Sequence, residues 1–102
     1  MITASELRKS MESNKNEIII SNITNYCLEN INKEVRQQAL KYYKNHYSYY
    51  LDSIQDKRIL DMFRYCIEND LRDDVLDKII EKLNEYGFKT QKLLNGIAIE
   101  WW

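Results

Sequence analysis

The apolar positions from Val75 onward change their spacing once, and that change predicts a helix followed by a β-hairpin. Val75, Ile79 and Leu83 recur at steps of four, as on the buried side of a helix. Asp74 lies just before this stripe and suits an N-cap, and Gly87 lies just after it, where helices commonly end. Beyond the glycine, apolar and polar residues alternate, which is the period of a strand.

The hairpin is predicted to turn at Asn95-Gly96, because a type I′ turn needs two residues that tolerate a positive φ. A two-residue loop there sets Leu94 opposite Ile97 and Lys92 opposite Ile99. The apolar face of the hairpin would then hold Phe88, Leu94, Ile97, Ile99 and Trp101. We expect this face to close over the helices that precede it, because a one-residue slip would expose it.

Two helices are predicted before residue 46. Thr3 and Glu6 form a capping box, so a short helix should begin at residue 4. It should end near Ser13-Asn14, because these residue types compete with helical hydrogen bonds. A second helix is expected from about Asn16 to Asn45. Its apolar stripe consists of Ile20, Ile23, Cys27, Ile31, Val35 and Ala39.

Residues 46–52, His-Tyr-Ser-Tyr-Tyr-Leu-Asp, fit either a strand or a continued helix. We favour a strand, because Tyr47, Tyr49 and Leu51 would share one face and a lone hairpin is only marginally stable in water. Ser53 with Asp56 resembles a further capping box.

A third helix follows that signal. Its apolar residues are Ile59, Leu60, Phe63, Cys66 and Ile67, and the stretch from Asn69 to Asp73 separates it from the last helix. The prediction is one α+β domain over residues 1–102. About four helices pack on one face of a small antiparallel sheet, made of the C-terminal hairpin and a third strand.

Charge and composition limit the function. The 102 residues carry 15 basic and 16 acidic side chains, a net charge of −1, which argues against nucleic acid as a partner. The longest apolar run, Ile18-Ile19-Ile20, is far too short to span a membrane, and the N-terminus does not resemble a signal peptide. We therefore expect no membrane partner. Two cysteines are too few for a disulfide scaffold and fit a reducing cytosol.

Residues that could do chemistry are few. His46, Ser48 and Asp52 would line one face of a strand, but same-face neighbours lie about 7 Å apart, which is too far for direct proton relay. Cys27 and Cys66 fall on apolar helical stripes, where cysteine behaves as a small hydrophobe. Their spacing does not fit a metal site. We therefore expect no enzyme activity, no metal and no cofactor.

The aromatic residues are the strongest indication of binding. Five tyrosines fall between residues 42 and 50, too many for one core face, and tyrosine is enriched at protein interfaces. The acidic run from Glu68 to Glu85 could dock a basic partner. The candidate protein-binding residues are Tyr43, Tyr47, Tyr49, Tyr50, Trp102, Asp70, Asp73 and Asp74. Partial burial of the tyrosines, and stacking of single-stranded bases on them, are alternative interpretations.

The two ends of the chain resemble small accessory proteins of tailed phages and other large DNA viruses. The pattern is Ile2-Thr3-Ala4-x-Glu6-Leu7-Arg8 at the start and Leu83-x-x-x-Gly87-Phe88 with Ile99-x-Trp101 at the end. Thr90 departs from it, since valine is common there. The resemblance implies a viral or mobile-element origin and supplies no catalytic residue.

From these features we expect a non-enzymatic protein that binds and blocks a host protein, as a host-takeover or anti-defence inhibitor in the host cytoplasm. One alternative is a minor structural or assembly protein of the virion. A second alternative is a binder of single-stranded nucleic acid. The expected partner is a host or viral protein, and self-association stays open.

Overall fold

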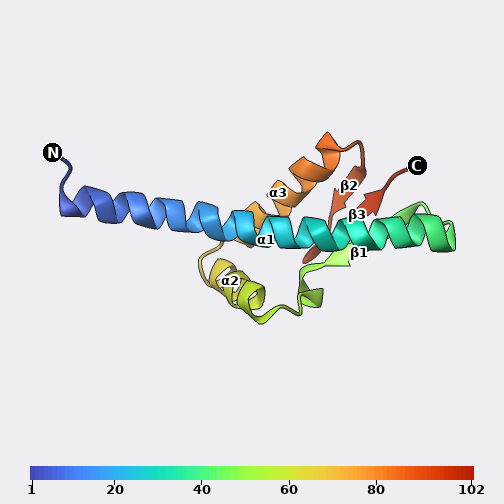
Figure 1. Cartoon of the computed structure of the whole chain (residues 1–102), viewed down its shortest axis with the longest axis horizontal. Coiled ribbons are helices and arrows are strands. Elements are labelled where there is room, and N and C mark those ends of the chain that lie inside the picture. Colours follow the sequence, from blue (N-terminus) through green and yellow to red (C-terminus); the bar gives the residue numbers. More distant parts are fainter.

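The computed structural model shows three helices and a three-stranded antiparallel sheet (Figure 1). It describes all 102 residues apart from the side chain of Ser13. The elements are α1 (Ala4–Tyr42), β1 (His46–Tyr50), a 3₁₀ turn (Leu51–Ser53), α2 (Lys57–Glu68), α3 (Arg72–Glu85), β2 (Lys89–Lys92) and β3 (Gly96–Glu100). The predicted α+β class is confirmed, with three helices in place of about four.

Helix α1 unites the two helices expected before residue 46, so the predicted break at Ser13-Asn14 is wrong. The capping box is confirmed at its start, where the Thr3 hydroxyl accepts a hydrogen bond from the Glu6 amide at 3.2 Å. Serine and asparagine each disfavour a helix interior by no more than about 0.7 kcal/mol relative to alanine, whereas a second helix would need its own nucleation. Because the stretch holds neither proline nor glycine, continuing one helix costs less free energy than nucleating a second one.

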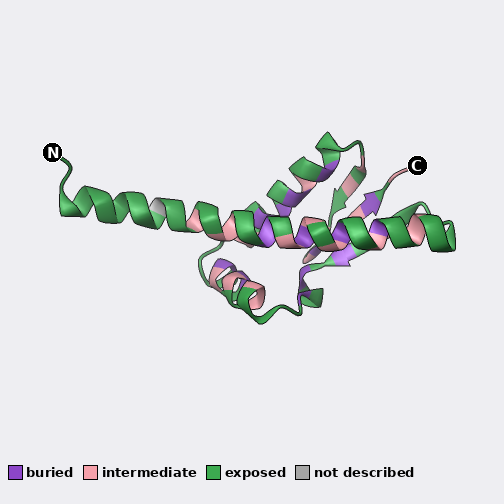
Figure 2. Ribbon diagram, in the orientation of Figure 1, coloured by how far each residue is buried: buried purple, intermediate pink, exposed green. Residues whose placement is uncertain are grey.

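Helix α1 has 39 residues and runs along the long axis of a molecule that measures 58 × 26 × 21 Å (Figure 1). Its C-terminal part packs against α2, α3 and β1. Its N-terminal part projects past them and is drawn as exposed in Figure 2. The last residue of the helix is Tyr42, and Tyr43 follows it as the C-cap with a left-handed φ of 56°. Lys44 donates its backbone N–H to the Gln38 carbonyl at 3.0 Å.

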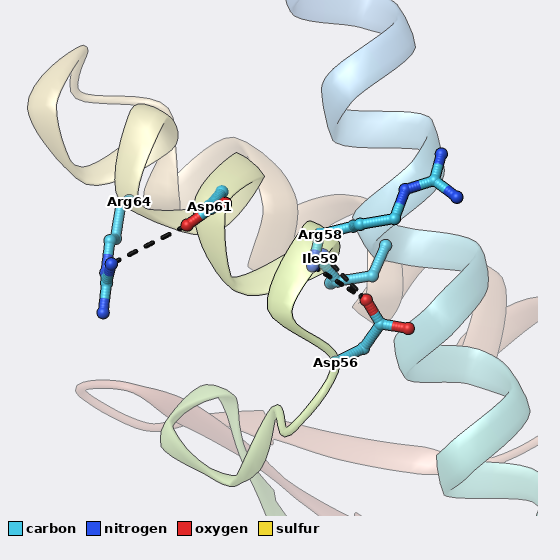
Figure 3. Close-up of polar contacts among 5 residues, drawn as sticks. All are labelled: Asp56, Arg58, Ile59, Asp61 and Arg64. Carbon is cyan, nitrogen blue, oxygen red and sulfur yellow. Dashed lines mark hydrogen bonds and ion pairs between the residues drawn. The ribbon is translucent and has the colours of Figure 1, made fainter.

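Helix α2 is capped by Asp56, not by Ser53. The Asp56 carboxylate accepts hydrogen bonds from the amides of Arg58 at 2.9 Å and Ile59 at 3.2 Å (Figure 3). These two amides are among the donors that a helix start leaves without partners. The Ser53 hydroxyl instead donates to the carbonyl of Tyr50 at 2.6 Å and closes the 3₁₀ turn after β1. An exposed Asp61–Arg64 pair (3.7 Å) lies further along α2 in the same view.

Helix α3 begins three residues earlier than predicted. Leu71 stands at its N-cap position, and Asp74 lies within the first turn, so Asp74 is not the cap. Asp70 reverses the chain between α2 and α3 with a φ of 56°. The predicted end of the helix is confirmed, because Gly87 has a φ of 89°, which costs glycine no strain.

The strand order is β1-β3-β2, so the predicted third strand is confirmed and pairs with the last strand of the hairpin. The hairpin register is shifted by two residues from the prediction: Lys92 lies opposite Ile97. The chain turns at Leu94-Asn95, where the Leu93 N–H donates to the Gly96 carbonyl at 2.9 Å. A shift of two keeps side chains on their predicted faces, except that Leu94 leaves the core face and is exposed.

The core lies between the inner face of the sheet and the three helices (Figure 2). Side chains from α1, α3 and the sheet supply most of it. Its fully buried members are Ile23, Cys27, Ile31, Leu51, Cys66, Val75, Leu76, Ile79, Ile97 and Ile99. The outer face of the sheet carries exposed polar residues, so the sheet buries one face only.

Candidate protein-binding surfaces

The predicted tyrosine surface is divided between the core and the solvent. Tyr49 is only 3% exposed, and Tyr47 is half-buried. Burial is also the main reason that the pKa of the Tyr49 hydroxyl is raised. Tyr49 is therefore a core residue and not a contact for a partner, which corrects its place among the candidate binding residues. Tyr43 and Tyr50 are exposed.

The exposed aromatic residues do not form one patch. The backbone N–H of Trp101 donates to the backbone carbonyl of Asn45 at 3.2 Å, and this bond brings Trp102 to the same end of the sheet as Tyr43. Both of these side chains are more than four-fifths exposed, at 86% and 90%. Tyr50 lies at the other end of β1, about 13 Å from His46 at the usual rise of an extended strand. The five-residue strand thus separates the predicted contacts into two groups.

The acidic candidates lie where α2 meets α3, and the charge of Asp73 is partly neutralised by Lys92. Lys92 forms ion pairs with Asp73 at 3.7 Å and Asp77 at 2.9 Å. The hydrogen bond to Asp77 is the main reason that the pKa of Lys92 is raised. Asp70 and Asp74 are exposed. The run therefore offers a smaller uncompensated charge than the sequence suggests.

The N-terminal part of α1 carries an apolar surface that the prediction did not single out. Leu7, Met11 and Ile18 are 48%, 70% and 58% exposed, and we call them the α1 stripe. Steps of four and seven residues place them on one face of the helix. Ile18 precedes the buried Cys27 by about two and a half turns, so the stripe faces away from the core.

An open groove of about 630 Å³ follows this stripe. It is lined by Met11, Glu12, Asn14, Lys15, Ile18 and Ile19. Lys15 lies over the ring of Tyr65 in α2, 4.7 Å from its centroid, and Asn16 accepts a hydrogen bond from the Tyr65 hydroxyl at 2.7 Å. These contacts are where α1 leaves the body of the protein, so the groove begins at the edge of the core and runs outward along the projecting helix.

The polar residues considered for chemistry are held in other contacts. The His46 imidazole is 3.1 Å from the Asn45 side chain, and Asp52 accepts a hydrogen bond from the Asn95 amide group. Asp52 belongs to the 3₁₀ turn, so it does not continue the face of β1 that carries Ser48. Among the side chains that the structure describes, no three His, Cys, Asp or Glu residues lie close enough together to hold a metal ion.

The two thiols are expected to be unreactive while the protein is folded. Burial raises the pKa of both Cys27 and Cys66 to about 11, and only a thiolate reacts readily. At pH 8, a disulfide reagent such as DTNB should therefore modify both thiols at the rate of unfolding. Rapid modification of either thiol without denaturant would contradict its burial.

Stability should also fall at alkaline pH. Between about pH 9 and 11, unfolded chains lose thiol protons that the folded protein keeps. The unfolded state then binds fewer protons, so the free energy of unfolding decreases as the pH rises through this window. The urea midpoint should be steady below pH 8 and decline above 9, and the decline should be smaller in a Cys27→Ala, Cys66→Ala double variant.

Comparison with known proteins gave no relative: no family model, no curated protein and no solved structure matches this chain. None of the helices in the described chain is both long enough and apolar enough to cross a membrane. The choice of a binding surface therefore depends on the geometry described above.

Proposed function

We propose that this protein acts by binding another protein without catalysis, as a phage-type accessory protein that blocks a host protein in the host cytoplasm. The projecting part of α1 is the contact surface. One observation carries the proposal: Leu7, Met11 and Ile18 are all exposed apolar side chains on one face of α1, and residues 4–12 of the helix are exposed throughout.

The physical reason is the marginal stability of such a segment. Although the segment continues α1 and needs no nucleation of its own, most helices owe their stability to an apolar face that packs against something. The side chains from Ala4 to Glu12 are all exposed. A partner that covers Leu7 and Met11 would supply the missing packing and hold this segment as a helix.

The chemistry of the surface indicates the kind of partner. Spacings of four and seven residues are those at which one helix packs along another, so the expected partner element is an amphipathic helix. Arg8 and Lys15 lie seven residues apart on the same flank of the α1 stripe. A partner helix with acidic residues beside its apolar face would therefore be complementary, and the charges would speed association more than they would strengthen it.

The expected result is that Met11→Glu weakens partner binding at least about tenfold, or 1.4 kcal/mol. It places a charge in the middle of the α1 stripe, where binding would have to desolvate it. Leu40→Glu is the matched control: Leu40 is 73% exposed and Met11 70%, and both lie in α1. The tagged chain would isolate a partner from host extract, and titration calorimetry of the purified pair would measure the dissociation constant. Equal affinities for the two variants would exclude the α1 stripe as the contact.

A further inference from the structure

The two edges of the sheet differ in how they are protected against pairing with another strand. Strand β2 is four residues long and carries Lys89 and Lys92, and lysine on an edge is a common device against sheet extension. Strand β1 is five residues long, His-Tyr-Ser-Tyr-Tyr, and holds no Lys, Arg, Asp, Glu or Pro. The β1 edge therefore lacks the usual protection.

The hydrogen bonds at the two ends of β1 show which of its backbone groups face away from the sheet. Leu51 donates its N–H to the Asn95 carbonyl at 2.9 Å, and Asn45 accepts from Trp101 at 3.2 Å. In an antiparallel pair, residues that bond across to β3 alternate with residues that do not. The odd positions of β1 therefore bond to β3, and the backbone N–H and C=O groups of His46, Ser48 and Tyr50 point outward.

A hollow lies on the inner side of β1. It is open, has a volume of about 270 Å³ and lies between α1, β1 and the turn that follows, with Glu34, Tyr47, Tyr49, Ser53 and Gln55 among its lining residues. The outward-facing carbonyl of Tyr50 already accepts the Ser53 hydroxyl, and its second lone pair is free for another donor. Within the described chain, β3 is the only strand that pairs with β1, and the turn after β1 contacts the outward edge at Tyr50.

We propose that β1 pairs with β1 of a second copy of this chain, antiparallel and about a two-fold axis through Ser48. Ser48 then lies opposite its own copy and His46 lies opposite Tyr50, so the outward-facing residues meet one another and each pair exchanges two hydrogen bonds. The two three-stranded sheets become one continuous six-stranded sheet. Such an interface is isologous, with the same strand contributed by each copy.

The side chains of β1 favour a second copy over a charged peptide. On the outer face, the exposed His46 would meet the exposed Tyr50, and aromatic cross-strand pairs of this kind are favourable, whereas Tyr49 stays in the core of its own copy. The strand contains no acidic or basic pair for which like charges would meet at a two-fold axis. Each copy has a net charge of only −1, so repulsion between whole molecules is small.

A cysteine at the centre of the strand tests the arrangement. Directly opposed, hydrogen-bonded residues have Cα atoms about 5.5 Å apart, which a disulfide can bridge. Ser48→Cys should therefore form an intermolecular disulfide under mild oxidation. Gln91→Cys, exposed on the same sheet face but in β2, should stay monomeric. The native Cys27 and Cys66 are fully buried and do not interfere. Equal cross-linking of the two variants would overturn the proposal.

A second experiment removes the pairing without covalent chemistry. Ser48→Pro deletes an outward-facing N–H and leaves the bonds between β1 and β3 in place, as edge prolines do. Sedimentation equilibrium should show a dimer for the wild-type chain and at least a tenfold larger dimer dissociation constant for this variant. Ser48→Lys, which sets two charges together at the axis, should do the same and serves if proline impairs folding.

The outcomes separate this proposal from the one for the α1 stripe. Met11→Glu should leave the dimer intact, and Ser48→Lys should leave each copy able to bind its partner protein. A wild-type chain that stays monomeric at about 100 μM would overturn β1 pairing. So would a dimer that Met11→Glu abolishes and Ser48→Lys does not, because the copies would then associate through α1.

Discussion

Replacing Gly96 with alanine is expected to lower the free energy of unfolding by about 3 kcal/mol, the upper end of the usual range for overpacking. An added Cβ would overlap the Tyr49 carbonyl oxygen and lie 2.7 Å from Cδ1 of Tyr50. The first of these atoms is backbone, so it moves only if β1 separates from β3. That separation would also disturb Tyr49, whose side chain is part of the core.

Two other variants make this measurement specific. Gly87→Ala should cost only about 1–2 kcal/mol, because its φ of +89° disfavours a side chain but an added Cβ would touch nothing within 4 Å. Leu94→Ser should change stability by less than about 0.5 kcal/mol, since Leu94 is 84% exposed. Urea unfolding with an unchanged m-value would give all three numbers. A larger cost at Gly87 than at Gly96 would show that β1 does not approach Gly96 this closely in solution.

Gly96 explains why the hairpin register could not be predicted from local sequence. The Asn95-Gly96 dipeptide favours a turn with positive φ, but Gly96 has no left-handed φ in the structure. Because Gly96 has no side chain, the strand β1 can approach it closely at Tyr50, which lies opposite. That strand lies far away in the sequence, so a rule based on two adjacent residues does not include it. The third strand therefore decides where the hairpin turns.

Elements that depend on short-range chemistry were predicted well. The cap at Thr3, the stop at Gly87 and the alternation in β1 each depend on residues a few positions apart. The helix break predicted near Asn14 does not occur, because the weak local preference of this residue competes with the cooperativity of the whole helix. The predicted break places Leu7 and Ile18 in different helices. The sequence prediction therefore does not put them on one face as the α1 stripe.

The candidate binding residues show the same limit. Alternation correctly puts Tyr47 and Tyr49 on one face of β1 and Tyr50 on the other, but the pattern alone does not say which face meets the core. Ile97 and Ile99, which lie opposite the first two, decide it. Cross-strand neighbours share a face of the sheet, so the burial of these two isoleucines places Tyr49 in the core. The sequence of β1 by itself does not contain that information.

A proline at Glu29 is expected to destabilise the protein by about 3 kcal/mol or more, whereas a proline at Glu12 should leave its global stability within about 1 kcal/mol. Both glutamates are exposed positions of α1, and proline removes a helical hydrogen bond and clashes with the preceding turn at either one. Around Glu29, however, that turn positions the buried Cys27 and Ile31. Around Glu12 it positions exposed side chains that lie outside the core.

The two prolines thus test whether the projecting part of α1 is coupled to the core. Glu12→Pro should reduce the helical circular dichroism signal while the thermal midpoint stays nearly constant, because only the segment before it loses helix. Glu29→Pro should lower the midpoint itself, since the core residues on both sides of the kink lose their alignment. If Glu12→Pro lowered the midpoint as much, the projecting segment would be packed in solution. A dependence of that loss on protein concentration would identify a second copy as what covers it.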